Sequence, residues 1–168
     1  MLFVVSELIV RATYSPRATR PSPTELAAWR SFLCAHATTA KALDRQLAGA
    51  GDLSLSEYDV LLNMAEGPRG GLRPTDLAER VLLTKSGLTR LLDRLVEVGF
   101  VERRACATDR RGQLVVLTAT GRRAFKRAAP IVVRSIGTFF SDALAGREID
   151  AFARSCERVT KAAEAMTA

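Results

Sequence analysis

The sequence contains few of the residues that build metal centres and nucleophilic catalytic sites. Its 168 residues include one histidine, His36, and three cysteines, Cys34, Cys106 and Cys156, which form no C-x-x-C pair. A zinc site would therefore need an unusual ligand set, and a Ser-His-Asp or Cys-His catalytic system would have to use His36. We expect no enzyme, no metal and no cofactor. The odd number of widely spaced cysteines favours reduced thiols in the cytoplasm.

The sequence also lacks an apolar run long enough to cross a membrane. The apolar start MLFVVSELIV contains Glu7 and has neither a basic segment before it nor a small-residue cleavage site after it. It is about half the length of a spanning helix. The Pro- and Arg-rich stretch RATYSPRATRPSP that follows is typical of a linker. We therefore predict no signal peptide, no membrane span and a flexible arm over residues 1–21.

Acidic residues are fewer than basic residues in this chain. Lys and Arg number 25 against 18 Asp and Glu, which gives a formal net charge of +7. This excess favours a polyanionic partner, with nucleic acid ahead of an anionic membrane because no basic amphipathic segment stands apart. The stretch GRRAFKRAAP carries four basic residues without an acid, namely Arg122, Arg123, Lys126 and Arg127. They could follow a DNA backbone, face an acidic ligand or form a solvated helix face.

Two capping boxes mark the starts of the first two predicted helices. Ser22 and Glu25 have the spacing of one box, which opens a helix that we expect to run to about Leu47 before GAGD ends it. Ser54 and Glu57 repeat the spacing, and the second helix is expected to end at the following Gly-Pro pair.

Two shorter helices joined by a tight turn are predicted next. LRPTDLAERV places Pro74 at the first helical position, and Thr84 caps the helix of TKSGLTRLLDRL. The leucines of that stretch have the spacing of one buried stripe, whereas its other face is polar. This arrangement is typical of a helix-turn-helix. The polar face consists of Lys85, Ser86, Thr89, Arg90 and Asp93.

After Gly99 the apolar period changes from 3.6 to about 2, which predicts strands. FVERRA and QLVVLT are joined by the basic turn CATDRRG, so we expect a hairpin, or wing, after the second short helix. From Thr118 the helical period returns in two segments, the first of which Pro130 should kink. The second is expected to bury one apolar seam, made of Ile149, Phe152, Cys156, Val159 and Ala163.

This order of elements, over roughly residues 22–165, resembles the MarR (multiple antibiotic resistance regulator) family of bacterial transcription factors. The most specific match is DRRGQLVVLTATG, which fits the family's wing pattern D-x-R-x-x-x-[VIL]-x-L-T-x-x-G. LSEYDVL, LRPTDLAERV and GLTRLLDRLVEVGFVERR are similar to the corresponding family stretches. One departure is Ala145, which stands where a Ser or another capping residue usually opens the last helix.

The resemblance implies a mainly α fold with a small β wing. It implies an N-terminal dimerisation helix over 22–52, a winged helix-turn-helix lobe over 53–121 and C-terminal dimerisation helices over 122–168. The implied function is that of a homodimeric regulator, expected to be a repressor, on a pseudo-palindromic double-stranded DNA operator.

The resemblance also places the expected DNA contacts. Residues near the start of a recognition helix meet base edges in the major groove, which selects Lys85, Ser86, Thr89 and Arg90. An arginine at the wing tip, Arg110 or Arg111, suits the narrow minor groove, and the wing aspartate, Asp109, is expected to hold it. Thr75 either contacts a phosphate or only caps its helix.

The sequence has fewer signals for the regulatory small molecule, or effector, than for DNA binding. Members of the family often bind small aromatic or phenolic anions between the dimerisation helices and the DNA-binding lobe, and Trp29, His36 and Asp59 lie on the segments that would line such a cleft. Each of them is equally compatible with a packing or surface role. Two alternatives remain: a thiol-oxidation sensor that uses Cys34, and a winged-helix module that binds proteins and no DNA.

Overall fold

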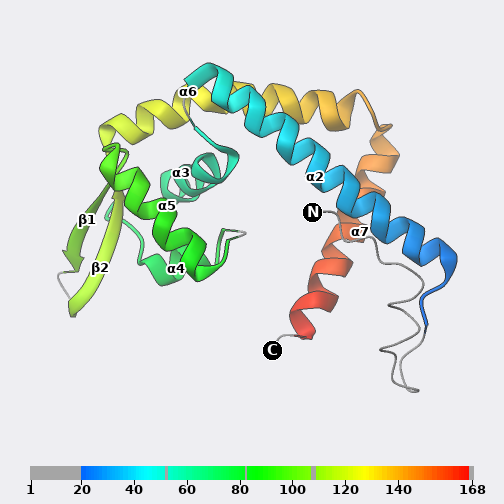
Figure 1. The fold of residues 1–168 in the computed structure, drawn as a ribbon, viewed down its shortest axis with the longest axis horizontal. Coiled ribbons are helices and arrows are strands. Elements are labelled where there is room, and N and C mark those ends of the chain that lie inside the picture. The colour runs from blue at the N-terminus through cyan, green and yellow to red at the C-terminus, as the bar shows by residue number, and fades with distance from the viewer. Residues whose placement is uncertain (1–19, 52, 82, 107–108, 167–168) are drawn as a thin grey trace. The chain divides into compact units, whose positions relative to one another are not determined.

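The computed structural model describes residues 20–51, 53–81, 83–106 and 109–166, without the side chains of 50–51, 85, 106 and 109–111 (Figure 1). Its contacts divide the chain into two units, residues 1–38 and 39–168, which are considered separately. The fold is mainly helical with one two-stranded antiparallel sheet, as the sequence predicts. The elements are α2 (Pro23–Gly51), α3 (Leu55–Glu66), α4 (Pro74–Ala78), α5 (Lys85–Glu97), β1 (Val101–Cys106), β2 (Asp109–Leu117), α6 (Ala119–Ile136), the π-helix η1 (Gly137–Ser141) and α7 (Gly146–Ala165).

The first helix begins as predicted and ends later than predicted. The Ser22 hydroxyl accepts the backbone N–H of Glu25 at 3.2 Å, and the Glu25 carboxylate accepts that of Ser22 at 2.6 Å. These hydrogen bonds from Ser22 hold the pKa of Glu25 below its ordinary value. α2 passes the expected end near Leu47 and ends at Gly51, within the stretch GAGD that the sequence predicts to end it. The first glycine of that stretch is tolerated because a glycine inside a helix costs only about 1 kcal/mol relative to alanine.

Within residues 39–168, one apolar core joins the end of α2 to the helix-turn-helix, the sheet and α6. The second capping box is confirmed, with mutual hydrogen bonds between Ser54 and Glu57 at the start of α3. The Tyr58 ring stacks on Phe125 of α6. Burial of the phenol raises the pKa of Tyr58, and the negative charge of the nearby Glu66 raises it further. The most completely buried core side chains are Leu47, Leu53, Val60, Leu61, Leu77, Leu95, Val101 and Val115.

The base of the wing is attached to the start of α6 by hydrogen bonds of the Thr118 hydroxyl. β1 and β2 pair antiparallel from Val101↔Leu117 to Ala105↔Gln113, and the register becomes irregular beyond Ala105. β2 begins at Asp109, earlier than the expected QLVVLT, so the hairpin is longer than the sequence predicts. At its base, Thr118 both caps α6, by accepting the Gly121 N–H at 3.0 Å, and donates to the Gly99 carbonyl at 2.7 Å.

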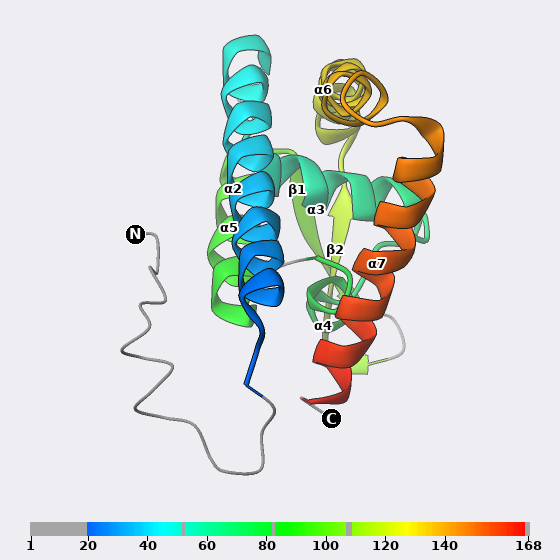
Figure 2. The same ribbon diagram turned by 90° about the vertical axis from the view of Figure 1, so that its right-hand side faces the viewer.

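The helix after the wing is not interrupted at Pro130. α6 is continuous from Ala119 to Ile136, and its turns superimpose in the nearly end-on view of Figure 2. Pro130 has no N–H, so the carbonyl oxygen of Lys126, four residues earlier, loses its helical hydrogen bond. Because both residues are exposed, water can satisfy that oxygen. Pro130 therefore does not break the helix, and the regular α-helix ends only at η1. The predicted kink stays a prediction.

The apolar seam of α7 is not buried within this chain. No described residue of α7 is classed as buried, and Phe152 and Val159 are 42% and 53% exposed. The expectation of a buried seam is thus wrong for the single chain. As the sequence indicates, Ala145 contributes no side-chain cap at the start of α7, and only the Glu148 carboxylate accepts a backbone hydrogen bond from Ala145, at 2.8 Å.

Candidate nucleic-acid interface

Helix α5 presents one apolar and one polar face, as the sequence predicts. Thr84 caps it by accepting the Gly87 N–H at 3.2 Å. Leu88, Leu92 and Leu95 are at most 2% exposed and fix the helix on the core. On the opposite side, Ser86, Thr89 and Arg90 are exposed, and the backbone of Lys85 is the first helical residue. These residues lie within the first two turns of one helix, which is the geometry required to enter a major groove.

An ion pair with a buried carboxylate holds the other end of α5 against α3. The Arg94 Nε lies 3.0 Å from Glu57 Oε1, and the Glu57 side chain is only 3% exposed. The second carboxylate oxygen accepts hydrogen bonds from the Ser54 N–H and hydroxyl at 2.7 and 2.9 Å. Glu57 therefore joins the start of α3 to the last turn of α5 and sets the orientation of the polar face. Its capping spacing was visible in the sequence, but its pairing with Arg94 has no local signal.

The two members of this ion pair should differ in their contributions to stability. Arg94→Met leaves a buried carboxylate without its cation and should lower the free energy of unfolding by about 1–3 kcal/mol. Glu57→Gln leaves only the Arg94 side chain unpaired, and that side chain is 63% exposed. This variant should therefore lose less free energy of unfolding, about 1 kcal/mol. Urea denaturation measures both values. The matched control is Asp93→Asn, which breaks an exposed pair worth about 0–1 kcal/mol; equal losses in all three variants would contradict the buried role of Glu57.

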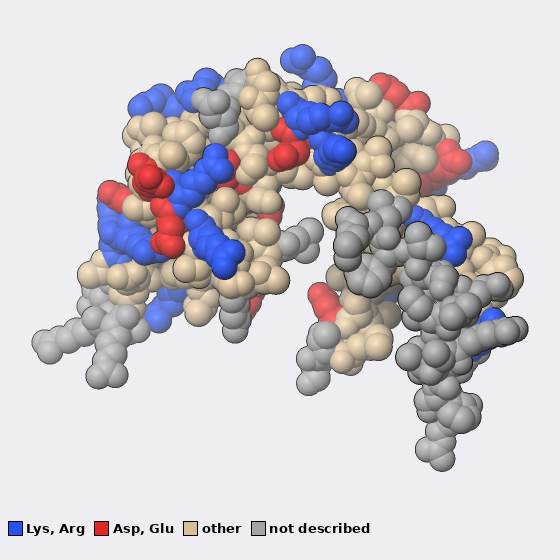
Figure 3. All heavy atoms as spheres, viewed as in Figure 1, with Lys and Arg blue, Asp and Glu red and all other residues tan. Residues whose placement is uncertain are grey.

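A second ion pair connects α5 to the wing. Asp93 Oδ1 accepts a hydrogen bond from Arg103 Nη2 of β1 at 2.6 Å, and Arg104 pairs with Glu102 along the same strand. Asp93, predicted to be part of the polar face of α5, thus joins α5 to β1 through its ion pair with Arg103. In Figure 3 the face over α5 accordingly shows both basic and acidic side chains.

The predicted wing residues are described only through their backbone. Asp109, Arg110 and Arg111 open β2, and their side chains lie outside the described part of the structure, as does that of Lys85. Their roles therefore stay predictions. Thr75 is exposed in the first turn of α4 and donates to the Asp76 carboxylate at 3.1 Å. It is not the capping residue, because Arg73 occupies the N-cap position.

The expected effector residues fall in different units of the chain. Trp29 is 47% exposed and lies 6.0 Å from the Phe32 ring, and His36 is also exposed, both within residues 20–38. Asp59, in α3, accepts a hydrogen bond from Asn63 Nδ2 at 3.3 Å. Whether these three residues line one cleft stays a prediction. Cys34 is exposed, with its sulfur 4.0 Å from the Thr38 hydroxyl, and Cys156 is half-buried.

A hollow within residues 39–168 is lined by none of the predicted effector residues. It has a volume of about 260 Å³ and lies where the end of α2, the start of α3 and the last turn of α5 meet. Its polar walls include Asp44, Glu57 and Arg94. The Asp44 carboxylate also accepts the Leu55 N–H at 2.8 Å, which ties α2 to the start of α3.

The described residues contain no group of three or more His, Cys, Asp or Glu side chains that could hold a metal ion. Among the same residues, no single helix is long and apolar enough to span a membrane, and only the bent pair Ala119–Ser141 and Gly146–Ala165 meets the length and composition criteria together.

Comparison with known proteins agrees with the geometry of this lobe. A model of the MarR family matches residues 51–112. A MarR family transcriptional regulator from Streptomyces coelicolor, solved in complex with DNA, is 30% identical with a TM-score of 0.82, and the match covers 88% of this chain and 92% of that one. AbsC, another regulator from that organism, is 27% identical with a TM-score of 0.79 over 88% and 99%.

A curated relative gives the same result over a shorter span. The transcriptional repressor YetL from Bacillus subtilis is 34% identical over 88 residues, which are 52% of this chain and 52% of YetL. The chain thus matches about half the length of this relative. The likeness to a 30% identical structure extends over 88% of this chain and 92% of that one, and the family model matches residues 51–112. The chain therefore belongs to the MarR family of winged helix-turn-helix transcriptional regulators.

Proposed function

We propose that this protein is a homodimeric repressor that binds a pseudo-palindromic DNA operator through α5 and the wing. The observation that carries the proposal is the exposed face of Ser86, Thr89 and Arg90 on a helix whose opposite face is fixed in the core. The DNA complex of the similar Streptomyces coelicolor regulator and the repressor designation of YetL support it. A protein-binding module would more often expose aromatic side chains on this face.

Arg90 is the residue for which base reading is expected. It is exposed and has no ion-pair partner among the described residues, so its guanidinium is available for a bidentate contact with guanine. Arg90→Ala should weaken operator binding by about 1–3 kcal/mol and relax the preference at one base pair. Fluorescence anisotropy with operator and random duplexes measures this.

The control for Arg90 is Arg147→Ala, which removes the same charge from the exposed start of α7 and should leave operator affinity unchanged. Equal losses on operator and random DNA would reduce Arg90 to a phosphate contact. If the protein bound neither duplex, the alternative of a protein-interaction module would replace this proposal.

Dimerisation explains why the terminal helices expose apolar side chains. Phe152 and Val159 form the outward part of the α7 seam, and a second copy would remove them from water. We expect a dimer in sedimentation at micromolar concentration, with Val159→Glu shifting it toward monomer and the neighbouring Thr160→Glu having little effect. A wild-type monomer would contradict the proposal. Such a dimer places two recognition helices on half-sites about 34–36 Å apart.

Release of the operator by a small aromatic or phenolic anion is the proposed mode of regulation, with Trp29, His36 and Asp59 as the residues that would contact the anion. Oxidation of Cys34 is the alternative mode of regulation. Its sulfur lies 4.0 Å from the neutral Thr38 hydroxyl, which does not stabilise the reactive thiolate as a cation would.

A further inference from the structure

A small pocket lies on the lobe where the loop between α3 and α4 meets the base of the wing and the start of α6. Its volume of about 10 Å³ has room for the centre of about one water molecule. Met64, Leu72 and Leu117 form its apolar wall, and Arg69 and Arg122 stand at its rim. The body of an organic ligand does not fit inside, so only a single ligand atom could enter from the rim.

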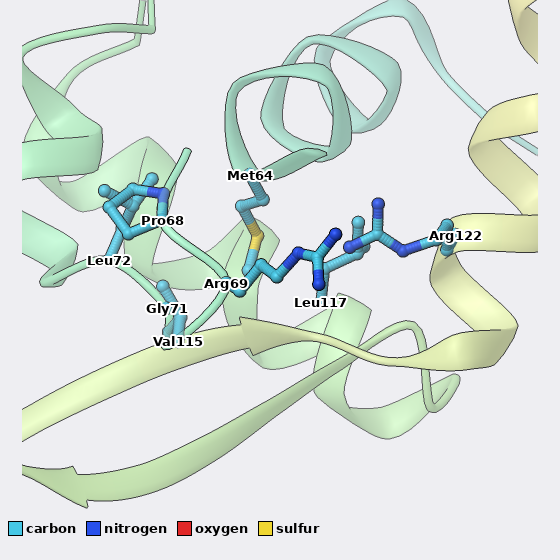
Figure 4. Close-up of a pocket in the computed structure, with 8 residues that line it drawn as sticks. All are labelled: Met64, Pro68, Arg69, Gly71, Leu72, Val115, Leu117 and Arg122. Carbon is cyan, nitrogen blue, oxygen red and sulfur yellow. The ribbon is translucent and has the colours of Figure 1, made fainter. Parts of the chain in front are cut away.

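The two arginines at the rim converge without an acidic partner. In Figure 4 the guanidinium groups of Arg69 and Arg122 point toward one another, although they come from different elements. Both side chains are exposed, and in the part of the chain that the structure describes neither has an ion pair. Other arginines of the lobe, such as Arg94 and Arg103, are neutralised by carboxylates. Two like charges that face one another create a local potential that favours an anion.

The backbone that carries the two arginines is held in place. Leu72 and Val115 exchange backbone hydrogen bonds of 3.0 and 2.8 Å, so the loop after Arg69 is paired to β2. Gly71 adopts φ +102, and a Cβ at this position would lie 2.6 Å from the Val115 carbonyl oxygen. On the other side, Arg122 is fixed in the first turns of α6, where its N–H bonds to the Thr118 carbonyl at 2.9 Å. The spacing between the two side-chain origins is therefore set by the fold.

The surroundings add positive charge. Arg123, Lys126 and Arg127 continue along α6 and are exposed, and Figure 3 shows basic side chains gathered over the first half of this helix. The amino end of α6 adds its positive dipole end. A guanidinium pair of this kind matches an oxyanion with two or more acceptor oxygens, since each fork can donate to a separate oxygen.

We propose that Arg69 and Arg122 form an oxyanion-binding site for a phosphate or carboxylate group, separate from the α5 face. The anion bridges the two guanidinium groups, with one oxygen at the mouth of the small pocket. The same chemistry has two sources: a free small anion, or a backbone phosphate of bound DNA. The site does not depend on base reading by α5, because Arg69 and Arg122 belong to other elements.

The test uses the full-length protein and two probes. Without DNA, inorganic phosphate and acetate are titrated at constant ionic strength while the NMR signals of the arginine side-chain N–H groups are followed. With operator DNA, the affinity is measured against salt concentration. The variants are Arg69→Gln and Arg122→Gln, and the matched control is Arg134→Gln, since that arginine is exposed in the last turn of the same helix and does not line the pocket.

The two sources give different results, and each supports the site. For a free anion, phosphate or acetate causes saturable shifts in wild type and Arg134→Gln that are lost in the two pocket variants, while operator binding stays unchanged. For a DNA phosphate, the slope of log K against log salt shrinks by about 0.9 in each pocket variant and not in the control. The proposal would be overturned if the pocket variants and the control gave the same phosphate and acetate titrations and the same salt slopes.

Discussion

Gly121→Ala is expected to lower the free energy of unfolding by about 3 kcal/mol or more. A Cβ at this position would lie 2.1 Å from the Phe100 carbonyl oxygen and 2.9 Å from the Phe100 carbonyl carbon and Leu117 Cδ1. The nearest atoms belong to backbone, so no side-chain rotation relieves the overlap. The start of α6 would have to separate from the base of the wing, which also breaks the Thr118 cap that joins them. Urea denaturation monitored by circular dichroism measures the loss.

The matched control is Gly49→Ala in α2, where a Cβ meets nothing within 4 Å. Replacing this helical glycine should stabilise the protein by as much as about 1 kcal/mol, because alanine is the better helix former. If Gly121→Ala were as harmless as Gly49→Ala, the close approach of α6 to Phe100 would not exist in solution. In the MarR resemblance Gly121 closes the wing pattern, and the contact supplies a packing reason for a glycine at that position.

Elements with strong local signals were predictable from the sequence. The capping boxes at Ser22 and Ser54 and the Thr84 cap all occur where the residue spacing places them, because each depends on contacts within four residues. The burial of the α5 leucines follows in the same way from helical periodicity. These local rules predict where helices begin better than where they end, as the extension of α2 to Gly51 illustrates.

Features that depend on distant contacts were not predictable. The partner of Glu57 is Arg94, 37 positions later, and the partner of Asp93 is Arg103 on the wing. The pocket at Arg69 and Arg122 arises only because a loop pairs with β2 beside the start of α6. The apolar seam of α7 was predictable, because its residues have helical spacing. The spacing does not indicate whether the surface that covers the seam belongs to the same chain, and within this chain Phe152 and Val159 stay exposed.

The wing arginines are expected to have the largest effect on DNA affinity among charge removals in this chain. Replacing both Arg110 and Arg111 by Ala should weaken operator binding and reduce the slope of log K against log salt. The slope should shrink by about 0.9 for each lost charge that contacts a phosphate or lies in the minor groove, which is about 2 for the double variant. The hairpin itself should persist, because β1 and β2 are paired by backbone from Val101 to Ala105 and Leu72 pairs with β2 at Val115.

A salt titration of operator binding, with thermal unfolding measured in parallel, separates this effect from misfolding. Asp109→Ala should give a milder form of the same defect, since it would loosen the arginine without removing its charge. The matched control is Arg104→Ala, which removes a cation from the same hairpin that Glu102 already neutralises, and its salt slope should stay near the wild-type value. A folded double variant with wild-type affinity and slope would show that DRRG is only a turn. Operator recognition would then depend on α5 alone, and Arg90→Ala would have to account for most of the specific binding.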